Sequence, residues 1–217
     1  MKAQSPTSLQ TFDTCPRQYE AKYITKEVVF KSSNHALFGD VIHKSIENYL
    51  KKGDPLPTIV RGLKPFLDKL KPLVRGVEER FAVDKEGKAC AYSSPKAVYR
   101  CAADLVLVSK DERFVICVDW KTGKKRDASI QHDVLAMCAM AEYPEASIVT
   151  AFVYLFTGDS DIREHKGLLF QTAKKTMAAL VAATANKSFP PKPGFLCGKW
   201  CDVTSCPFNG KNKDSKK

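Results

Sequence analysis

The chain has 217 residues, of which 44% are hydrophobic and 10% aromatic, so it can bury one substantial core. Its longest apolar stretches, residues 148–156 and 114–120, are much shorter than the roughly 20 residues that cross a bilayer. The polar N-terminus, residues 1–14, lacks the apolar core of a secretory signal. We therefore expect a cytoplasmic protein without a membrane span.

The charge balance indicates a polyanionic partner. The formal net charge is +11 and the isoelectric point is near 9.2. Residues 210–217 carry four lysines and one aspartate, so this tail supplies +3 and is expected to be disordered. The remaining +8 still favours nucleic acid over a merely solubilising surface, because clustered Lys and Arg side chains displace the counterions that condense on nucleic acid.

The first third of the chain has the three- and four-residue spacing of apolar side chains that predicts helices. Pro16 interrupts residues 5–27, which we therefore expect to form two short helices. Residues 37–52 predict a longer helix that ends at Gly53. The side chains expected to face the core from this helix are Leu37, Val41, Ile42, Ile46, Tyr49 and Leu50.

The pattern then changes from helix to strand. Residues 56–70 predict a further helix, broken by Pro65. From residue 74 the chain predicts three strands, residues 74–83, 97–108 and 113–120, joined by polar turns. These strands should form an antiparallel meander.

The second half of the chain returns to alternating elements. Residues 129–142 predict a helix, and residues 147–156 and 161–168 predict a hairpin. A closing helix is expected over residues 170–185, followed by a proline-rich segment over residues 189–194 that cannot be helical.

Two aspartates lie where neighbouring strands of the meander should face each other. If the connecting loop is residues 110–113, residues whose numbers sum to 223 are paired, and Asp104 is then opposite Asp119. Directly opposed residues share a face with Cβ atoms about 4.5–5.5 Å apart, and Lys121, two residues after Asp119, joins that face. A shift of one residue in the loop would remove this arrangement.

Two opposed carboxylates in an apolar setting are costly without a cation between them. Mg²⁺ prefers one or two carboxylates together with waters and phosphate oxygens, and it lowers the pKa of a bound water. Lys121 would orient that water or help to deprotonate it. The spacing of Asp104, Asp119 and Lys121 therefore predicts Mg²⁺- or Mn²⁺-assisted cleavage of phosphodiesters. The alternative is that these three residues end strands in solvent.

Three motifs extend this constellation. Residues 118–124, Val-Asp-Trp-Lys-Thr-Gly-Lys, resemble the D-x-K-T-G motif of RecB-type nucleases in the PD-(D/E)XK superfamily. Residues 38–47 resemble the G-x-x-x-H helix of that family, and residues 103–106 resemble its second-strand aspartate segment. The resemblance covers residues 8–206. It implies an α/β fold in which a mixed β-sheet is flanked by helices.

The resemblance also implies a set of metal ligands. His43 would bind the metal beside Asp104 and Asp119, and the main-chain carbonyl of Trp120 would complete the set. Without the resemblance, a single helical histidine such as His43 is more often a structural residue.

Two further site residues are implied in the same way. Glu78 or Glu79 stands where the family has a strand-one glutamate, and Glu78 is our candidate. Gln131 matches the first residue of the family's Q-x-x-x-Y helix, which approaches DNA and the site, although Leu135 replaces the tyrosine.

The eight cysteines fall into two groups of four. The first group lies singly among apolar residues, as small core side chains do, and consists of Cys90, Cys101, Cys117 and Cys138. The second group lies in polar segments near the chain ends and consists of Cys15, Cys197, Cys201 and Cys206. A disulfide framework is not expected in a cytosolic chain of this size.

The second group resembles the split four-cysteine pattern of iron–sulfur RecB-type nucleases, including the AddB-like and CRISPR-adaptation branches. The middle C-terminal cysteine, Cys201, is displaced by one position. The resemblance implies a [4Fe–4S] cluster that joins the N- and C-terminal segments of a single nuclease domain, residues 1–209. Four thiolates also suit tetrahedral zinc, which remains the alternative.

We therefore expect a metal-dependent DNA nuclease, most simply an exonuclease of a bacterial or phage-infected cell that acts in recombination, repair or phage DNA processing. Its substrate would be single-stranded DNA or duplex ends, with Lys124, Lys125 and Arg126 near the phosphates. The alternatives are an inactive nucleic-acid-binding module and a zinc-stabilised interaction domain.

Overall fold

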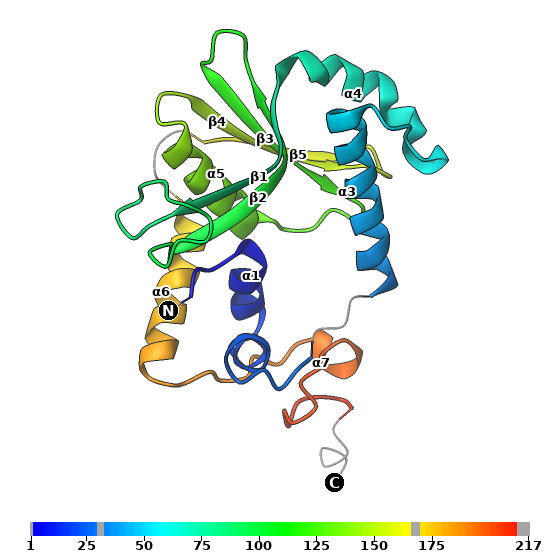
Figure 1. The fold of residues 1–217 in the computed structure, drawn as a ribbon. Coiled ribbons are helices and arrows are strands. Elements are labelled where there is room, and N and C mark those ends of the chain that lie inside the picture. The colour runs from blue at the N-terminus through cyan, green and yellow to red at the C-terminus, as the bar shows by residue number, and fades with distance from the viewer. Residues whose placement is uncertain (1, 30–32, 166–169, 212–217) are drawn as a thin grey trace. The chain divides into compact units, whose positions relative to one another are not determined.

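The computed structural model describes residues 2–29, 33–165 and 170–211 (Figure 1). The chain divides into two compact units. The first, here called the sheet unit, comprises Met1–Gln4 and Ser32–Phe170. The second, here called the terminal unit, comprises Ser5–Lys31 and Gln171–Lys217.

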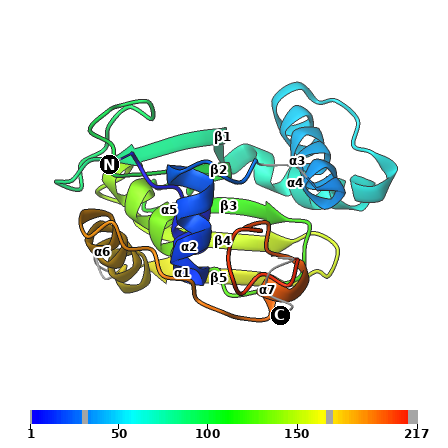
Figure 2. The ribbon, with the colours of Figure 1, turned by 90° about the horizontal axis from the view of Figure 1, so that it is seen from below.

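The sheet unit is built on five strands in the order β1-β2-β3-β4-β5, which Figure 2 shows in succession. The strands are β1 (Val74–Val83), β2 (Tyr99–Val108), β3 (Phe114–Lys121), β4 (Ser147–Tyr154) and β5 (Ser160–His165). The first three pair antiparallel, as the polar turns between them predict. Strands β3 and β4 are parallel because a helix connects them, and β4 and β5 form the expected hairpin. This mixed sheet with helices confirms the predicted α/β fold.

Helix α5 (Ser129–Glu142) is the crossover between β3 and β4, and its bounds are those predicted. It packs along β1, β2 and β4, and it buries seven of its fourteen residues. Cys101, Cys117 and Cys138 are buried in the sheet unit, and burial raises the pKa of Cys117 to about 12. These three thiols are core side chains, as predicted, whereas Cys90 is only half-buried.

A second core lies between the sheet and the helices that precede it. These elements are α3 (Asn34–Lys52), the 3₁₀ helix η2 (Thr58–Leu63), α4 (Lys64–Leu70) and the 3₁₀ turn η3 (Lys71–Leu73). Ile42, Ile46 and Leu67 pack there against Leu105 and Trp120. Figure 1 shows α3 and α4 on a different side of the sheet from α5. The sheet is therefore covered by helices on both sides.

The boundaries of α3 follow from its caps. The Ser33 side chain accepts a hydrogen bond from the Ala36 amide, and Gly53 ends the helix in the left-handed conformation with φ of 78°. The prediction that Leu37 and Val41 face the core is wrong, since their exposed fractions are 51% and 59%.

The reason lies in the angular width of the buried stripe on α3. Ile42, Ile46 and Tyr49 follow one another at spacings of three and four residues and form the buried face. Val41 stands about 100° around the helix from Ile42, outside that face. The side chains on this second face, which include Phe38, point away from the core.

The terminal unit contains α1 (Pro6–Thr14), α2 (Pro16–Tyr19), the π-helix η1 (Glu20–Ile24), α6 (Gln171–Ala185) and α7 (Leu196–Lys199). The predicted break at Pro16 and the predicted closing helix are both confirmed. A reciprocal pair of hydrogen bonds between Ser5 and Ser8 caps α1. The four-residue helix α7 was not predicted, because one turn leaves no periodic pattern to detect.

None of the helices in the described residues is long and apolar enough to cross a membrane. The predicted hairpin and basic tail extend into residues 166–168 and 212–217, which lie outside the described part of the chain.

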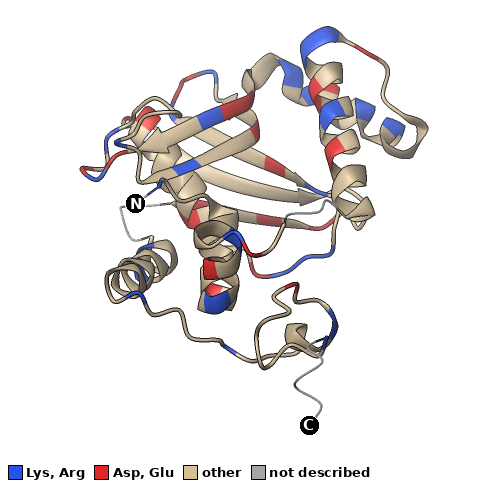
Figure 3. Ribbon diagram, turned by 60° about the horizontal axis from the view of Figure 1, so that its bottom comes forward, with Lys and Arg blue, Asp and Glu red and all other residues tan. Residues whose placement is uncertain are grey.

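The loop between β3 and α5 carries three basic residues, Lys124, Lys125 and Arg126, all of them exposed. Figure 3 shows this loop as a run of blue. The Lys125 ammonium donates a hydrogen bond to the main-chain oxygen of Ser160 at 2.9 Å, so the loop is tied to the start of β5. The described loop therefore has a fixed contact point beside the β4–β5 connection.

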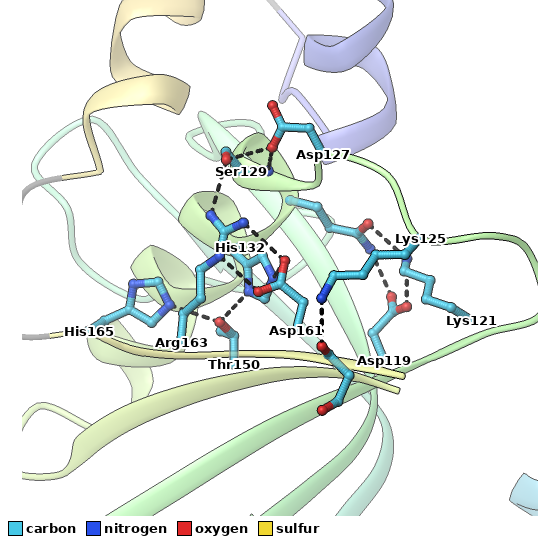
Figure 4. A network of polar contacts seen from close by, with 12 residues as sticks. Asp119, Lys121, Lys125, Asp127, Ser129, His132, Thr150, Asp161, Arg163 and His165 are labelled. Carbon is cyan, nitrogen blue, oxygen red and sulfur yellow. Dashed lines mark hydrogen bonds and ion pairs between the residues drawn. The ribbon is translucent and has the colours of Figure 1, made fainter. Parts of the chain in front are cut away.

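A polar network lies inside the sheet unit between α5, β4 and β5 (Figure 4). The His132 side chain is fully buried, and its Nδ1 lies 2.6 Å from the Thr150 hydroxyl, which in turn lies 2.8 Å from His165 Nε2. His132 Nε2 is 3.2 Å from an Asp161 carboxylate oxygen. Arg163 binds both carboxylate oxygens of Asp161.

Burial, followed by the charge of Arg163, lowers the pKa of His132 to about 4, although Asp161 acts in the opposite direction. Burial also lowers the pKa of His165. His132 is therefore neutral in the folded protein at neutral pH. Sequence patterns did not reveal this network, because its members are ordinary residues of one helix and two strands.

The protein should lose stability as pH falls from about 6.5 to about 4. In this window the unfolded chain binds a proton at His132 that the folded chain does not, so the free energy of unfolding decreases, by roughly 3 kcal/mol from this residue. Urea unfolding at a series of pH values measures the slope. His132→Gln should remove most of it, whereas His35→Gln, at an exposed position, should not. An unchanged slope in His132→Gln would contradict this assignment.

Candidate active site

The site begins where strands β2 and β3 separate. Their ladder pairs Val108 with Val115 and ends at Leu105 with Val118, so the predicted register, in which residue numbers sum to 223, is confirmed. Asp104 is the next residue, just beyond the last ladder pair. Its Oδ2 accepts a hydrogen bond from the Trp120 amide at 2.6 Å. A side chain thus takes the place of the backbone acceptor that the ladder no longer provides.

The other carboxylate oxygen of Asp104 points to helix α3. Asp104 Oδ1 lies 3.1 Å from His43 Nδ1. The helix presents His43 there because Ile42, its neighbour, is anchored in the core. The Gly39 backbone, one turn earlier, is close to Thr122, since a Cβ built at Gly39 would lie 3.1 Å from the Thr122 hydroxyl. A side chain at residue 39 would require the Thr122 side chain to shift by a few tenths of an ångström.

Strand β1 supplies the third member of the group. The β1–β2 register pairs Val77 with Leu105 and Glu79 with Ala103, which places Glu78 opposite Asp104. Glu78 has a φ of 59°, a left-handed conformation that costs a residue with a Cβ on the order of 1 kcal/mol or more. Strain of this kind persists where the surroundings impose it, and here it directs the carboxylate toward Asp104.

His43, Glu78 and Asp104 each offer a ligand atom, and these atoms all lie within 4.8 Å of one another. One imidazole and two carboxylates form a donor set that suits a hard divalent cation such as Mg²⁺ or Mn²⁺. The structure thereby brings together three of the residues that the sequence singled out.

The electrostatics of this group also suit a cation. Burial of the ring lowers the pKa of His43, but the hydrogen bond and charge of Asp104 outweigh it, with help from Asp119 and Glu78, and the net shift is upward. The loss of hydration, the charges of Asp104 and Glu47 and a hydrogen bond to Asp104 raise the pKa of Glu78. Negative charge is therefore concentrated here, and a divalent ion would compete with protons for it.

A second group adjoins the first along β3. The Lys121 ammonium lies 2.6 Å from Asp119 Oδ2 and donates a hydrogen bond to Gln131 Oε1 at 2.8 Å. The Gln131 amide donates in turn to Asp119 Oδ1 at 2.7 Å, which closes a triangle between β3 and α5 (Figure 4). The Lys121 ammonium also lies 4.7 Å from the centre of the Phe152 ring.

Asp119 is 9% exposed, and burial raises the pKa of its carboxyl, an effect that Lys121 opposes and Asp104 reinforces. Its Oδ2 is buried and lies 2.6 Å from the Lys121 ammonium, whose charge partly offsets that of the carboxylate. A carboxylate oxygen has two lone pairs, so a bound cation could share this oxygen with the ammonium.

The two groups are connected but distinct. Asp119 lies outside the close set of His43, Glu78 and Asp104, and Trp120 links the groups through its amide. The Glu79 side chain folds against Gly76, so Glu78 is the glutamate that reaches Asp104.

Phe152 is a site neighbour that the sequence did not reveal. Its ring, which lies beside the Lys121 ammonium, also stacks on the His132 ring, with 3.8 Å between their centres. The interpretation of residues 147–156 as a strand gave no reason to single it out.

In the terminal unit, a small cavity is lined by all four cysteines near the chain ends, Cys15, Cys197, Cys201 and Cys206. The Lys192 amide donates a hydrogen bond to the Cys15 sulfur and the Gly194 amide donates one to the Cys197 sulfur, both at 3.4 Å. All eight cysteines lie in the described part of the chain and none forms a disulfide. The cysteines of the second group, from both ends of the chain, thus face one space.

A divalent ion should stabilise the fold if the carboxylate group binds it. Mn²⁺ at about 100 times its dissociation constant should raise the free energy of unfolding by about 2.7 kcal/mol, seen as an increase in Tm. Asp104→Asn should abolish the increase, whereas Asp54→Asn, at an exposed position, should retain it. The same increase in both variants would place the ion elsewhere.

Comparison with known proteins identifies the family of the chain and supports its architecture. The family model described as the PD-(D/E)XK nuclease superfamily matches residues 3–209 and so extends over both compact units. A solved structure, that of SSO0001, has a similar fold at 16% sequence identity, with a TM-score of 0.53 over 96% of this chain and 87% of that chain. The search of curated proteins found no match. On the extent of the family match, the chain belongs to the PD-(D/E)XK nuclease superfamily.

Proposed function

We propose that this protein is a Mg²⁺- or Mn²⁺-dependent deoxyribonuclease, acting as an exonuclease in recombination, repair or phage DNA processing. Membership of the superfamily implies a metal-dependent nuclease. The observation that carries the proposal is that two groups of side chains adjoin each other: His43, Glu78 and Asp104 form one, and Asp119 and Lys121 form the other. The hydrogen bond from the Trp120 amide to Asp104 links them, because Trp120 lies between Asp119 and Lys121 in β3.

The residues divide the chemistry between them. His43, Glu78, Asp104 and Asp119 would hold the ion, with the Trp120 carbonyl proposed from the motif alone. The ion, when bound, polarises the phosphate and lowers the pKa of a water.

Lys121 supplies the positive charge that the protein itself brings to the reaction. Its ammonium is fixed by Asp119 and Gln131, so it is positioned before substrate arrives. A fixed cation stabilises negative charge on a pentavalent phosphate without reorganisation during the reaction. It can also orient the attacking water through its remaining protons.

The basic loop at residues 124–126 supports a polyanionic substrate. Its three cations are exposed, and the Lys125 ammonium is held at the start of β5 by its hydrogen bond to Ser160. The phosphates of a bound strand would therefore lie near a positive charge of fixed position. The choice of DNA over RNA and the exonuclease mode rest on the resemblance to RecB-type enzymes.

Replacement of Lys121 tests the catalytic proposal. Purified protein with Mn²⁺ should degrade end-labelled DNA, and Lys121→Ala should reduce the rate about 10²- to 10⁴-fold, because a positioned charge and proton donor is lost. Lys88→Ala, at an exposed lysine in the β1–β2 connection, is the matched control. Circular DNA should resist digestion if the enzyme requires ends.

Equal inertness of wild type and Lys121→Ala on DNA and RNA, with nucleic-acid binding retained, would favour the inactive binding module instead. Cleavage of circular DNA at the rate of linear DNA would contradict the exonuclease mode.

We also propose that the four clustered cysteines bind a [4Fe–4S] cluster, with a structural role in the terminal unit. All four line one cavity, and main-chain amides already donate to two of the sulfurs, as they do to cluster thiolates. The cluster would cross-link Cys15 to the C-terminal segment.

Protein purified without oxygen should be brown and contain about one [4Fe–4S] cluster per chain. Cys206→Ser should lose iron and lower the Tm, whereas Cys90→Ser should not, because Cys90 belongs to the sheet unit. Stoichiometric zinc in place of iron would contradict the cluster and support the tetrahedral alternative.

A further inference from the structure

Two exposed aromatic side chains meet beside the candidate active site. Phe38 lies on the outer face of α3 and Phe156 follows β4, and their ring centres are 5.8 Å apart with the planes inclined by 30°. They are 40% and 45% exposed. Leu37 and Val41 extend the same exposed apolar face along α3. Apolar groups gathered on a surface from two separate elements indicate a binding role.

The backbone places this aromatic pair at the end of β3, where Lys121 lies. Gly39, which follows Phe38, packs against Thr122, which follows Lys121. The amide of Leu155, which precedes Phe156, donates to the Lys121 main-chain oxygen at 2.9 Å. Phe38 therefore adjoins a residue that lies close to the Thr122 side chain, and Phe156 adjoins a residue that is hydrogen-bonded to the Lys121 backbone.

Positive charge lies in the same region. The basic loop begins two residues after Thr122. Its Lys125 contacts Ser160, at the far end of the short connection that carries Phe156. Aromatic rings next to Lys and Arg are the combination that binds unpaired nucleotides, with the bases stacked on the rings and the phosphates near the cations. A base inside a duplex offers its edges, since its faces are already stacked.

A protein partner fits this surface less well. Stable protein contacts bury about 800 Å² on each partner and exclude charge from their centre. Here four apolar side chains adjoin three exposed cations.

We propose that Phe38 and Phe156 form a stacking platform for an unpaired base next to the cleaved phosphate, and that the preferred substrate is single-stranded nucleic acid or a frayed end. This proposal rests on the nuclease site described above. Phe38 and Phe156 are specificity residues in this proposal, since they contact a base and not the reacting phosphate.

The test measures binding without cleavage. Fluorescence anisotropy in EDTA compares labelled oligothymidylate, an abasic strand of equal length and a duplex. For wild type, oligothymidylate should bind more tightly than the abasic strand. Phe38→Ala/Phe156→Ala should weaken oligothymidylate binding by about 5- to 150-fold, the range of one stacked base, and leave abasic and duplex binding unchanged.

Three further variants separate stacking from other effects. Phe38→Leu/Phe156→Leu keeps apolar side chains but not the rings, so it should lose oligothymidylate binding with an unchanged Tm. Phe38→Tyr/Phe156→Tyr should restore binding. Phe114→Ala removes an equally exposed phenylalanine (44%) at the opposite end of β3 and should bind as wild type does.

Several results would overturn the platform. These are wild-type affinity in the double alanine variant, a parallel loss on abasic or duplex substrates, or a wild-type dimer that the double variant converts to monomers in sedimentation. An oligouridylate arm shows whether the stacked strand is DNA or RNA. Failure of the nuclease proposal is a separate result, because wild type would then stack oligothymidylate without cleaving any strand.

Discussion

The hydrogen bond from the Trp120 amide to the Asp104 carboxylate is the contact on which the site depends. It lies where the β2–β3 ladder ends, so it both terminates the regular sheet and fixes the direction of one carboxylate. Because one oxygen is held by the backbone, the other is directed to His43. The Glu78 carboxylate and the His43 ring then lie close to an Asp104 carboxylate whose direction is fixed. Loss of this hydrogen bond would leave the buried Trp120 amide without an acceptor. It would also free the Asp104 carboxylate to rotate away from His43.

The site concentrates features that oppose folding. Loss of hydration and the negative charge of Asp104 raise the pKa of both Asp119 and Glu78, and Glu78 also has a left-handed backbone. The surrounding sheet unit must offset these terms through burial of Trp120, Phe152 and the α5 face. Lys121 partly balances the carboxylates, and its position beside the Phe152 ring connects it to the packed core around His132. Stability of the core and position of the ammonium are thereby coupled.

Sequence patterns predicted most of the sheet unit because its signals are local. The polar turn between β2 and β3 defines their register, which is as predicted up to the Leu105–Val118 pair, one position before Asp104 and Asp119. Patterns could not show which face of α3 would be covered, so Leu37 and Val41 were assigned to the core although they are exposed. The contacts of Phe38 with Phe156, and of His132 with Thr150, join residues distant in sequence and depend on tertiary packing.

The left-handed backbone at Glu78 has an evolutionary consequence. Glycine is the residue that this conformation suits best, so a mutation to glycine relaxes the strand while it deletes the carboxylate. Without selection for activity, a glycine at residue 78 would therefore be favoured, because it stabilises the fold while it removes a proposed metal ligand. A glutamate retained at residue 78 across descendants would therefore report continuing selection for activity, and a glycine there would identify a lineage that keeps the fold for another purpose.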